Sequence, residues 1–168
     1  MLITIMLLIF SFLFEGFISN YLSSSLGNFN LFSTLYTLIC LIVVFPYFYN
    51  EKKYYILLII FGALIDIVHT NTFMLNIVLF IIISIIIKII NLILPENILM
   101  VNIMSICAVM LYYILSYLVL TIINYNTYPL ALLFELCLNS LAMTIIYTSI
   151  LYCTIEFLFS KFDIKQIK

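Results

Sequence analysis

Charged residues are scarce in this chain. Only 8% of its 168 residues are Asp, Glu, Lys or Arg, whereas 67% are hydrophobic and the mean hydropathy is +1.36. A soluble domain carries about 25% charged and about 45–50% apolar residues, so this chain has too little polar surface to cover a water-soluble globule. The composition therefore predicts an integral membrane protein.

Residue types that many enzymes require are also missing. The chain has no arginine, because all six basic residues are lysines, and its four cysteines show no CxxC or Cys/His spacing. It has no DxxD motif for a metal-dependent phosphate enzyme and no phosphate-binding glycine loop. A net charge of −1 argues against nucleic-acid binding. We therefore predict no metal site, no cofactor and no nucleic-acid partner.

The remaining candidates for intramembrane catalysis lack partners. His69 is the only histidine and has no serine in a glycine-rich setting, as a rhomboid-type hydrolase would need. Asp66 is the only intramembrane aspartate, whereas an aspartyl protease needs two that face each other. These absences predict a non-enzymatic protein with no catalytic residue.

The apolar runs predict helices. Stretches such as Ile77–Ile83 are continuously apolar and lack the alternation of a barrel strand, and helices are the other way to satisfy the backbone in lipid. Residues 1–22 lack a basic start and contain Glu15, so we interpret them as a first transmembrane helix rather than a cleaved signal. Polar clusters divide the chain, as one all-α domain over residues 1–168, into six transmembrane helices at 2–22, 31–49, 54–69, 73–94, 98–123 and 129–159.

The lysines orient these helices. Lys52 and Lys53 lie between the second and third helices, Lys88 lies near the end of the fourth, and the other three follow the sixth. With both termini in the cytoplasm, all six lysines are cytoplasmic and the three outer loops contain none, as the positive-inside rule predicts. A five-helix chain would move one group of lysines outside. We therefore predict a polytopic membrane protein with both termini cytoplasmic.

One helix face carries unusual residues for its position. Gly62, Asp66 and His69 are spaced i, i+4 and i+7 inside an apolar run, so a regular helix would place them on one face. Asp66 follows Lys53 by thirteen residues, about 20 Å of helix, which puts it in the outer half of the membrane. An ionisable group at this depth is costly and is usually kept for a function.

Two further carboxylates are expected at the same level. Glu15 lies late in the first helix, and Glu135 lies early in the sixth with Asn139 one turn on. Two interpretations are open for these groups. They either hold helices together through hydrogen bonds or line an outward cavity or partner-binding surface. The candidate face consists of Gly62, Asp66, His69, Glu15, Glu135 and Asn139.

A second polar stripe runs along the fifth predicted helix. It consists of Asn102, Ser105, Tyr112 and Ser116, whose spacings of three, seven and four fit one inward face. We interpret this stripe as a seam that packs against neighbouring helices.

The run FGALIDIVHTNTFMLNIVLF, within residues 55–83, resembles the central signature of the MreD family, small multi-pass subunits of the bacterial rod-shape complex. That family shows Gly-x-x-x-Asp near the end of a helix, a short polar turn, and a Leu-Gly-x-Asn-like start to the next helix. Gly62 and Asp66 match the first part, residues 69–72 match the turn, and Asn76 matches the polar position. Met74 stands where the family carries its glycine. The length, the six predicted helices and the short lysine-bearing tail fit over the whole chain.

The resemblance implies a scaffold of the elongasome in the bacterial cytoplasmic membrane. Such a protein would be a partner of an MreC-like membrane protein. It would help couple MreB filaments to the glycosyltransferase RodA and a class B penicillin-binding protein, and hence to peptidoglycan synthesis, cell wall biogenesis and cell shape.

An alternative is the substrate-binding S component of an energy-coupling-factor vitamin transporter. These proteins are similar in size and helix number and can carry a Gly-x-x-x-Asp segment. The acidic outer half would then bind a small ligand. Against this alternative, the first helix has no alanine, whereas that family docks its membrane partner through an Ala-x-x-x-Ala face there.

Overall fold

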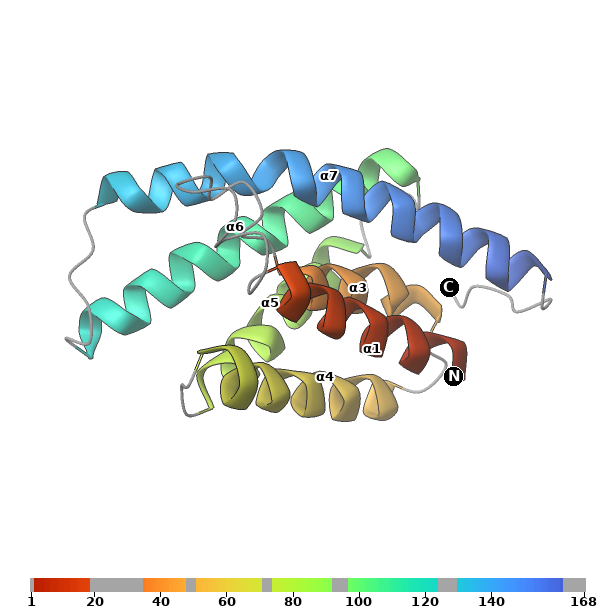
Figure 1. Cartoon of the computed structure of the whole chain (residues 1–168), viewed down its shortest axis with the longest axis horizontal. Coiled ribbons are helices and arrows are strands. Elements are labelled where there is room, and N and C mark those ends of the chain that lie inside the picture. The colour runs from red at the N-terminus through yellow and green to blue at the C-terminus, as the bar shows by residue number, and fades with distance from the viewer. Residues whose placement is uncertain are drawn as a thin grey trace.

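The structure, a computed structural model, describes residues 2–18, 35–47, 51–70, 74–91, 97–123 and 130–161, and these residues form helices and no strand. The first pair is α1 (Leu2–Phe17) and α3 (Tyr36–Val44), which continues into a 3-10 turn, η3 (Phe45–Tyr47). Next come α4 (Glu51–Ile65), its π-helical continuation η4 (Asp66–Thr70), and α5 (Leu75–Asn91). The last pair is α6 (Ile98–Ile122) and α7 (Leu130–Lys161), as Figure 1 shows.

The all-helical prediction is confirmed, and each of the six predicted segments contains one of these helices. The fourth predicted segment includes Met74, which precedes the first residue of α5, Leu75. The third ends differently from the prediction, because residues 66–69 belong to the wider π turn η4. Residues 19–22, 31–34, 48–49, 73, 92–94 and 129 of the predicted segments lie outside the described part of the chain.

Successive helices run in alternating directions. In Figure 1, α1, α4 and α6 point one way, and α3, α5 and α7 return. The beginning of α1 and the end of α7 consequently lie at the same end of the molecule, which we call the basal end. Away from the basal end, α1 and α4 finish and α3 and α5 begin, and we call this the distal end; α6 and α7 extend beyond it. The candidate face lies toward this distal end.

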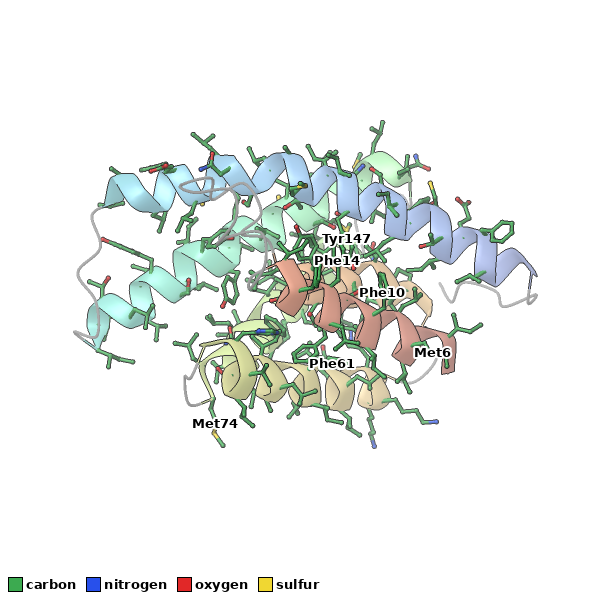
Figure 2. The ribbon with its side chains drawn as sticks, in the orientation of Figure 1. Met6, Phe10, Phe14, Phe61, Met74 and Tyr147 are labelled. Atoms are coloured by element: carbon green, nitrogen blue, oxygen red, sulfur yellow. The ribbon has the colours of Figure 1, made fainter. Side chains whose placement is uncertain are left out.

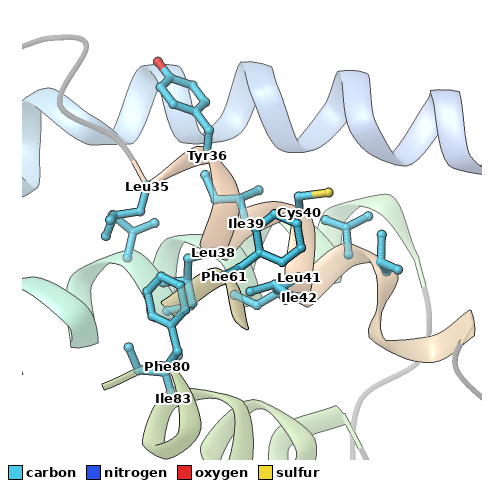
Figure 3. Packing of buried hydrophobic residues seen from close by; sticks show 14 of the residues in the cluster. Leu35, Tyr36, Leu38, Ile39, Cys40, Leu41, Ile42, Phe61, Phe80 and Ile83 are labelled. Carbon is cyan, nitrogen blue, oxygen red and sulfur yellow. The ribbon is translucent and has the colours of Figure 1, made fainter. Parts of the chain in front are cut away.

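Helix α3 forms the centre of the core. All nine of its residues are buried, because its sequence YTLICLIVV offers no charged face to turn outward. Its side chains belong to one apolar cluster with Phe61 of α4 and with Phe80 and Ile83 of α5, which Figure 3 shows from close by. The outer helices therefore wrap around a short, fully enclosed segment.

Large apolar side chains cover the outside of the molecule. Exposed fractions reach 72% for Ile67, 66% for Leu138 and 78% for Ile122. Soluble monomers rarely expose apolar surface over large contiguous patches. Two helical stretches, Ile98–Ile122 and Leu133–Leu158, are long and apolar enough to cross a membrane.

Polar side chains join the helices inside this apolar shell. Asn102 of α6 donates a hydrogen bond from Nδ2 to Oγ of Ser149 in α7 at 3.1 Å. Within the same predicted stripe, Ser105 and Tyr112 are buried, so these three members face neighbouring helices as expected. Ser116, the fourth member, is half-buried and bonds to the carbonyl oxygen of Tyr113 in its own helix.

A second polar contact joins the first and last helices. The Tyr147 hydroxyl donates to Oγ of Ser11 at 2.8 Å, and its ring stacks on Phe14 with centroids 5.8 Å apart (Figure 2). Tyr36, at the start of α3, meets the same tyrosine edge-on at 4.7 Å. These contacts fix α1, α3 and α7 to one another below the distal end.

Candidate functional site

Glu15 of α1 caps the start of another helix, α3. Its Oε2 accepts hydrogen bonds from the backbone N–H of Thr37 at 2.9 Å and from the Thr37 hydroxyl at 2.7 Å. Thr37 is the second residue of α3, whose first turn has unpaired N–H groups and the positive end of the helix dipole. The residue at the local cap position, Leu35, has no side-chain oxygen and makes no capping bond. Glu15 therefore supplies the missing cap from α1.

Asp66 does the same for α5. Its Oδ1 and Oδ2 accept from the backbone N–H of Asn76 at 3.1 and 3.2 Å, and Oδ1 also accepts from the Asn76 side-chain amide at 2.9 Å. Asn76 is the second residue of α5, and Asp66 is only 3% exposed. Both buried carboxylates of the described candidate face are thus satisfied by the start of the next helix.

Asn76 passes the connection on to α6. The Tyr112 hydroxyl donates to Oδ1 of Asn76 at 2.5 Å, and the Asn76 side chain is fully buried. Asn76 therefore donates to Asp66 from two groups and accepts from Tyr112 through a third. We call this chain of three residues the α4–α5–α6 junction.

Gly62 allows α4 and α5 to approach closely enough for the junction to form. A Cβ added at Gly62 would lie 2.9 Å from Cα and 3.2 Å from the backbone nitrogen of Ile77. Real Cβ atoms essentially never lie as close as the first of these distances, and backbone atoms cannot rotate aside. Because Asp66 lies one turn after Gly62, this close crossing brings its carboxylate to the first turn of α5.

His69 faces a different helix from Gly62 and Asp66. A Cβ added at Gly16 of α1 would lie 2.9 Å from Cε1 of His69, and the imidazole ring lies 5.0 Å from the ring of Phe12. Nε2 of His69 is buried and has no hydrogen-bond partner in the described part of the chain. The single face predicted for the three residues is therefore split, because the wider turns of η4 redirect the positions after Ile65.

Met74 carries the one irregular backbone angle at the start of α5. Its φ is 57°, which makes it the only non-glycine residue with a positive φ among the described residues. This left-handed conformation costs a residue with a Cβ roughly 1–2 kcal/mol. The side chain is 55% exposed and points away from the ribbon in Figure 2, so its own contacts do not offset that cost.

The structure does not bring Glu135 and Asn139 to these carboxylates. Glu135 is exposed and Asn139 is half-buried on α7, and neither makes a side-chain hydrogen bond within the described residues. The hydrogen bond between Tyr147 of α7 and Ser11 of α1 marks one level in both helices. Glu135 lies about 18 Å of helix before Tyr147, whereas Glu15 lies only about 6 Å after Ser11. The long α7 therefore carries Glu135 well past Glu15, and the predicted level of three carboxylates contains two.

Sequence reasoning missed Thr37 as the partner of Glu15, Asn76 as the partner of Asp66, and Tyr112 as the partner of Asn76. One signal was present in the sequence. Neither Leu35 nor Met74, which immediately precede α3 and α5, is a residue type that caps helices. A missing local cap indicates that another part of the chain supplies one.

The chemistry of this site is hydrogen bonding between helices. No group of three or more His, Cys, Asp or Glu side chains that could hold a metal ion occurs in the described ranges. Glu15 and Asp66 direct their oxygens at N–H and O–H donors of the protein itself. The arrangement therefore suits fixing helix positions at the distal end.

Comparisons with known proteins add no relative. No protein-family model, curated protein or solved structure matches the chain. The interpretation of the site therefore rests on its residues and geometry.

Proposed function

We propose that this chain is a non-enzymatic, six-span scaffold of the bacterial elongasome, similar to the MreD family. In this role it binds an MreC-like membrane protein and helps couple MreB to RodA and a class B penicillin-binding protein. Nearly all of its mass lies in apolar helices, so its binding surfaces are helix faces and short connections.

The observation that carries the proposal is the backbone of Met74. The resemblance to the MreD signature places a glycine at this position, and glycine is the residue that most readily adopts a positive φ. Met74 has a φ of 57° despite its side chain. Of the neighbouring matched residues, Gly62 packs on Ile77 and Asp66 bonds to Asn76, both in the first turn of the helix that follows Met74. A positive φ at the position where the family carries its glycine therefore supports the resemblance there.

The state of the carboxylates favours a scaffold over a transporter S component. A subunit that captures a small ligand needs polar groups directed into a cavity. Here Glu15 and Asp66 accept hydrogen bonds from the starts of α3 and α5 instead. Polar side chains that serve helix contacts are what a rigid membrane scaffold requires.

The direction of the helices supports six spans with both termini in the cytoplasm. Lys52 and Lys53 are exposed at the start of α4, Lys88 lies in the last turn of α5, and Lys161 ends α7. Because these positions lie where α1 begins, the basal end collects the described lysines, as the cytoplasmic side of a membrane protein does. The distal end then faces outward.

Labelling in whole cells tests this topology. In a variant whose four native cysteines are serine, Met74→Cys is expected to react with a membrane-impermeant maleimide in intact cells. Lys52→Cys is expected to react only after the membrane is permeabilised. Both native side chains are exposed, so access to the reagent differs only by side of the membrane. Labelling of both from outside, or of Met74→Cys only after permeabilisation, contradicts the proposed orientation.

Depletion in the bacterium that encodes the chain tests the function. Cells that lose the protein are expected to become wide and round. An affinity-tagged copy is expected to retain an MreC-like protein through purification in mild detergent. Re-expression of the wild-type chain serves as the control and restores the rod shape. Cells that remain rod-shaped but lose uptake of one vitamin would instead indicate the S component.

A further inference from the structure

The outward face of α7 differs from the outward faces of α1, α4 and α5. Among the described residues, every exposed side chain of α1 and α5, and of α4 and η4 after Lys53, is large and apolar, which suits contact with lipid. The exposed side chains of α7 also include small and polar ones, namely Ala131, Glu135, Ala142, Cys153, Thr154 and Glu156. Small and polar residues are typical of surfaces where membrane helices pack against each other.

One line of residues along this face has the spacing of a coiled-coil seam. It consists of Glu135, Asn139, Ala142, Ile146 and Cys153, with spacings of four, three, four and seven residues, and we call it the α7 seam. Four of the five are exposed and Asn139 is half-buried. Ser149, which would complete the repeat, bonds instead to Asn102 of α6.

The α7 seam faces away from the rest of the chain. The buried side chains of α7, which are Ser140, Thr144, Thr148, Leu151 and Ile155, lie on the opposite face of the helix, where α3 and α6 contact it. In Figure 1, α7 runs along the upper edge of the molecule. A second helix can therefore approach along the length of the seam.

Two polar side chains of the seam lie at membrane depth. Glu135 and Asn139 belong to the stretch Leu133–Leu158, which is long and apolar enough to cross a membrane. Neither side chain makes a hydrogen bond within the described residues. A polar side chain that faces lipid is costly, and membrane helices satisfy such groups through hydrogen bonds to a neighbouring helix. We therefore expect the seam to bind a helix that carries polar groups at the same depth.

A second α7 meets this requirement by symmetry. Two copies inserted in the same direction are related by a two-fold axis along the membrane normal, so their α7 helices run parallel and each seam residue lies opposite its own counterpart. The Asn139 amide both donates and accepts, so it can pair with the same amide and donate its other N–H to the neighbouring Glu135. An unlike helix would have to match the depth of both polar groups independently.

We propose that the α7 seam joins two copies of this chain into a parallel homodimer within the membrane. Ala142 and Cys153 are small and allow the two backbones to approach, and Asn139 fixes the register. From Glu135 to Cys153 the seam covers about 27 Å of helix, close to the hydrocarbon thickness of about 30 Å. The inference goes beyond the proposed scaffold role and does not depend on it, because it requires only that α7 lies in a membrane.

Disulfide trapping at the native Cys153 tests the dimer. In a full-length variant whose other three cysteines are serine, oxidation with copper phenanthroline in membrane vesicles is expected to convert most of the chain into a disulfide-linked dimer. Thr154→Cys combined with Cys153→Ser moves the thiol about 100° around the same helix to another exposed position, so this variant should stay monomeric. A variant that keeps only Cys107, exposed on α6, should also stay monomeric.

Substitutions in the seam test which groups hold the dimer. Single-molecule photobleaching of the purified full chain in liposomes, at increasing lipid dilution, measures the dimer fraction. Asn139→Leu is expected to weaken pairing about three- to tenfold, and Ala142→Phe at least as much. Thr154→Leu makes a similar change outside the seam and should pair like wild type. The seam lies outside each folded copy, so circular dichroism should show an unchanged helix content in all three variants.

Several results would overturn the dimer. Equal cross-linking through Cys153, Thr154→Cys and Cys107 would show random collision. Single chains at every lipid dilution would show that lipid alone covers the seam, and cross-linking of Cys153 only to a different protein would show an unlike partner helix. Round cells on depletion of a monomeric chain would leave the scaffold standing without the dimer. A dimer in a bacterium that keeps its shape on depletion would leave the dimer standing without the scaffold.

Discussion

Replacement of Gly62 by alanine is expected to lower the free energy of unfolding by about 2–4 kcal/mol. The new Cβ would lie 2.9 Å from Cα of Ile77, and backbone atoms cannot rotate away as a side chain can. α4 and α5 must therefore separate, which weakens their packing and stretches the bonds between Asp66 and Asn76. The gain in helix propensity from glycine to alanine, about 1 kcal/mol, offsets only part of this loss.

Gly16→Ala is the matched control for this prediction. Its Cβ would also approach an atom at 2.9 Å, but that atom belongs to the His69 side chain, which can move. Unfolding in detergent, followed by circular dichroism against added denaturant, should show a clearly larger loss for Gly62→Ala. Equal losses in the two variants would show that the close crossing of α4 and α5 does not depend on Gly62.

The positions of the helices could be predicted from the sequence because the residues between them differ in polarity from those within them. Polar clusters interrupt long apolar runs, and each predicted segment contains one observed helix. The central place of α3 was not readable. Its nine residues are apolar like those of every other helix here, so hydrophobicity alone cannot tell an enclosed helix from one that faces lipid.

The candidate site was likewise predictable only in part. Gly62 and Asp66 were found because their one-turn spacing is a local property of a single helix. The hydrogen-bond partners in the site were not found from the sequence, because Thr37 lies 22 residues from Glu15, and Tyr112 lies 36 residues from Asn76. Such pairings depend on which helices become neighbours. The π turn that redirects His69 has no signature in the sequence that we can name.

The first two helix pairs share one construction. In each, a carboxylate near the end of the first helix accepts from the second residue of the next helix, over 22 residues in one pair and 10 in the other. Each cap places a carboxyl oxygen at the unpaired N–H groups and the positive end of a helix dipole. A buried acid in an apolar helix can thus cap the start of a neighbouring helix rather than bind a ligand. Glu15 and Asp66 are therefore interpreted as groups that hold helices together.

Replacement of Asp66 by leucine is expected to cost about 3–5 kcal/mol of stability, whereas asparagine at the same position should cost about 1–2 kcal/mol. Leucine removes the acceptor for both the backbone N–H and the side-chain amide of Asn76, which is fully buried. Asparagine keeps one acceptor oxygen but loses the second, and its amide group would be a donor that faces the N–H of Asn76. The order wild type, Asp66→Asn, Asp66→Leu should hold for unfolding in detergent and for restoration of rod shape in depleted cells.

Glu135→Leu provides the control for removing a carboxylate. Glu135 is exposed on α7 and its side chain makes no hydrogen bond with the described residues, so its replacement should change stability by less than about 0.5 kcal/mol. If Asp66→Leu behaves like Glu135→Leu, the α4–α5–α6 junction does not hold the distal end together. If both Asp66 variants lose stability in the expected order but restore rod shape fully, the junction is structural and the partner binds elsewhere. Loss of shape with Asp66→Asn, whose fold is largely kept, would instead place the carboxyl group of Asp66 itself in the function.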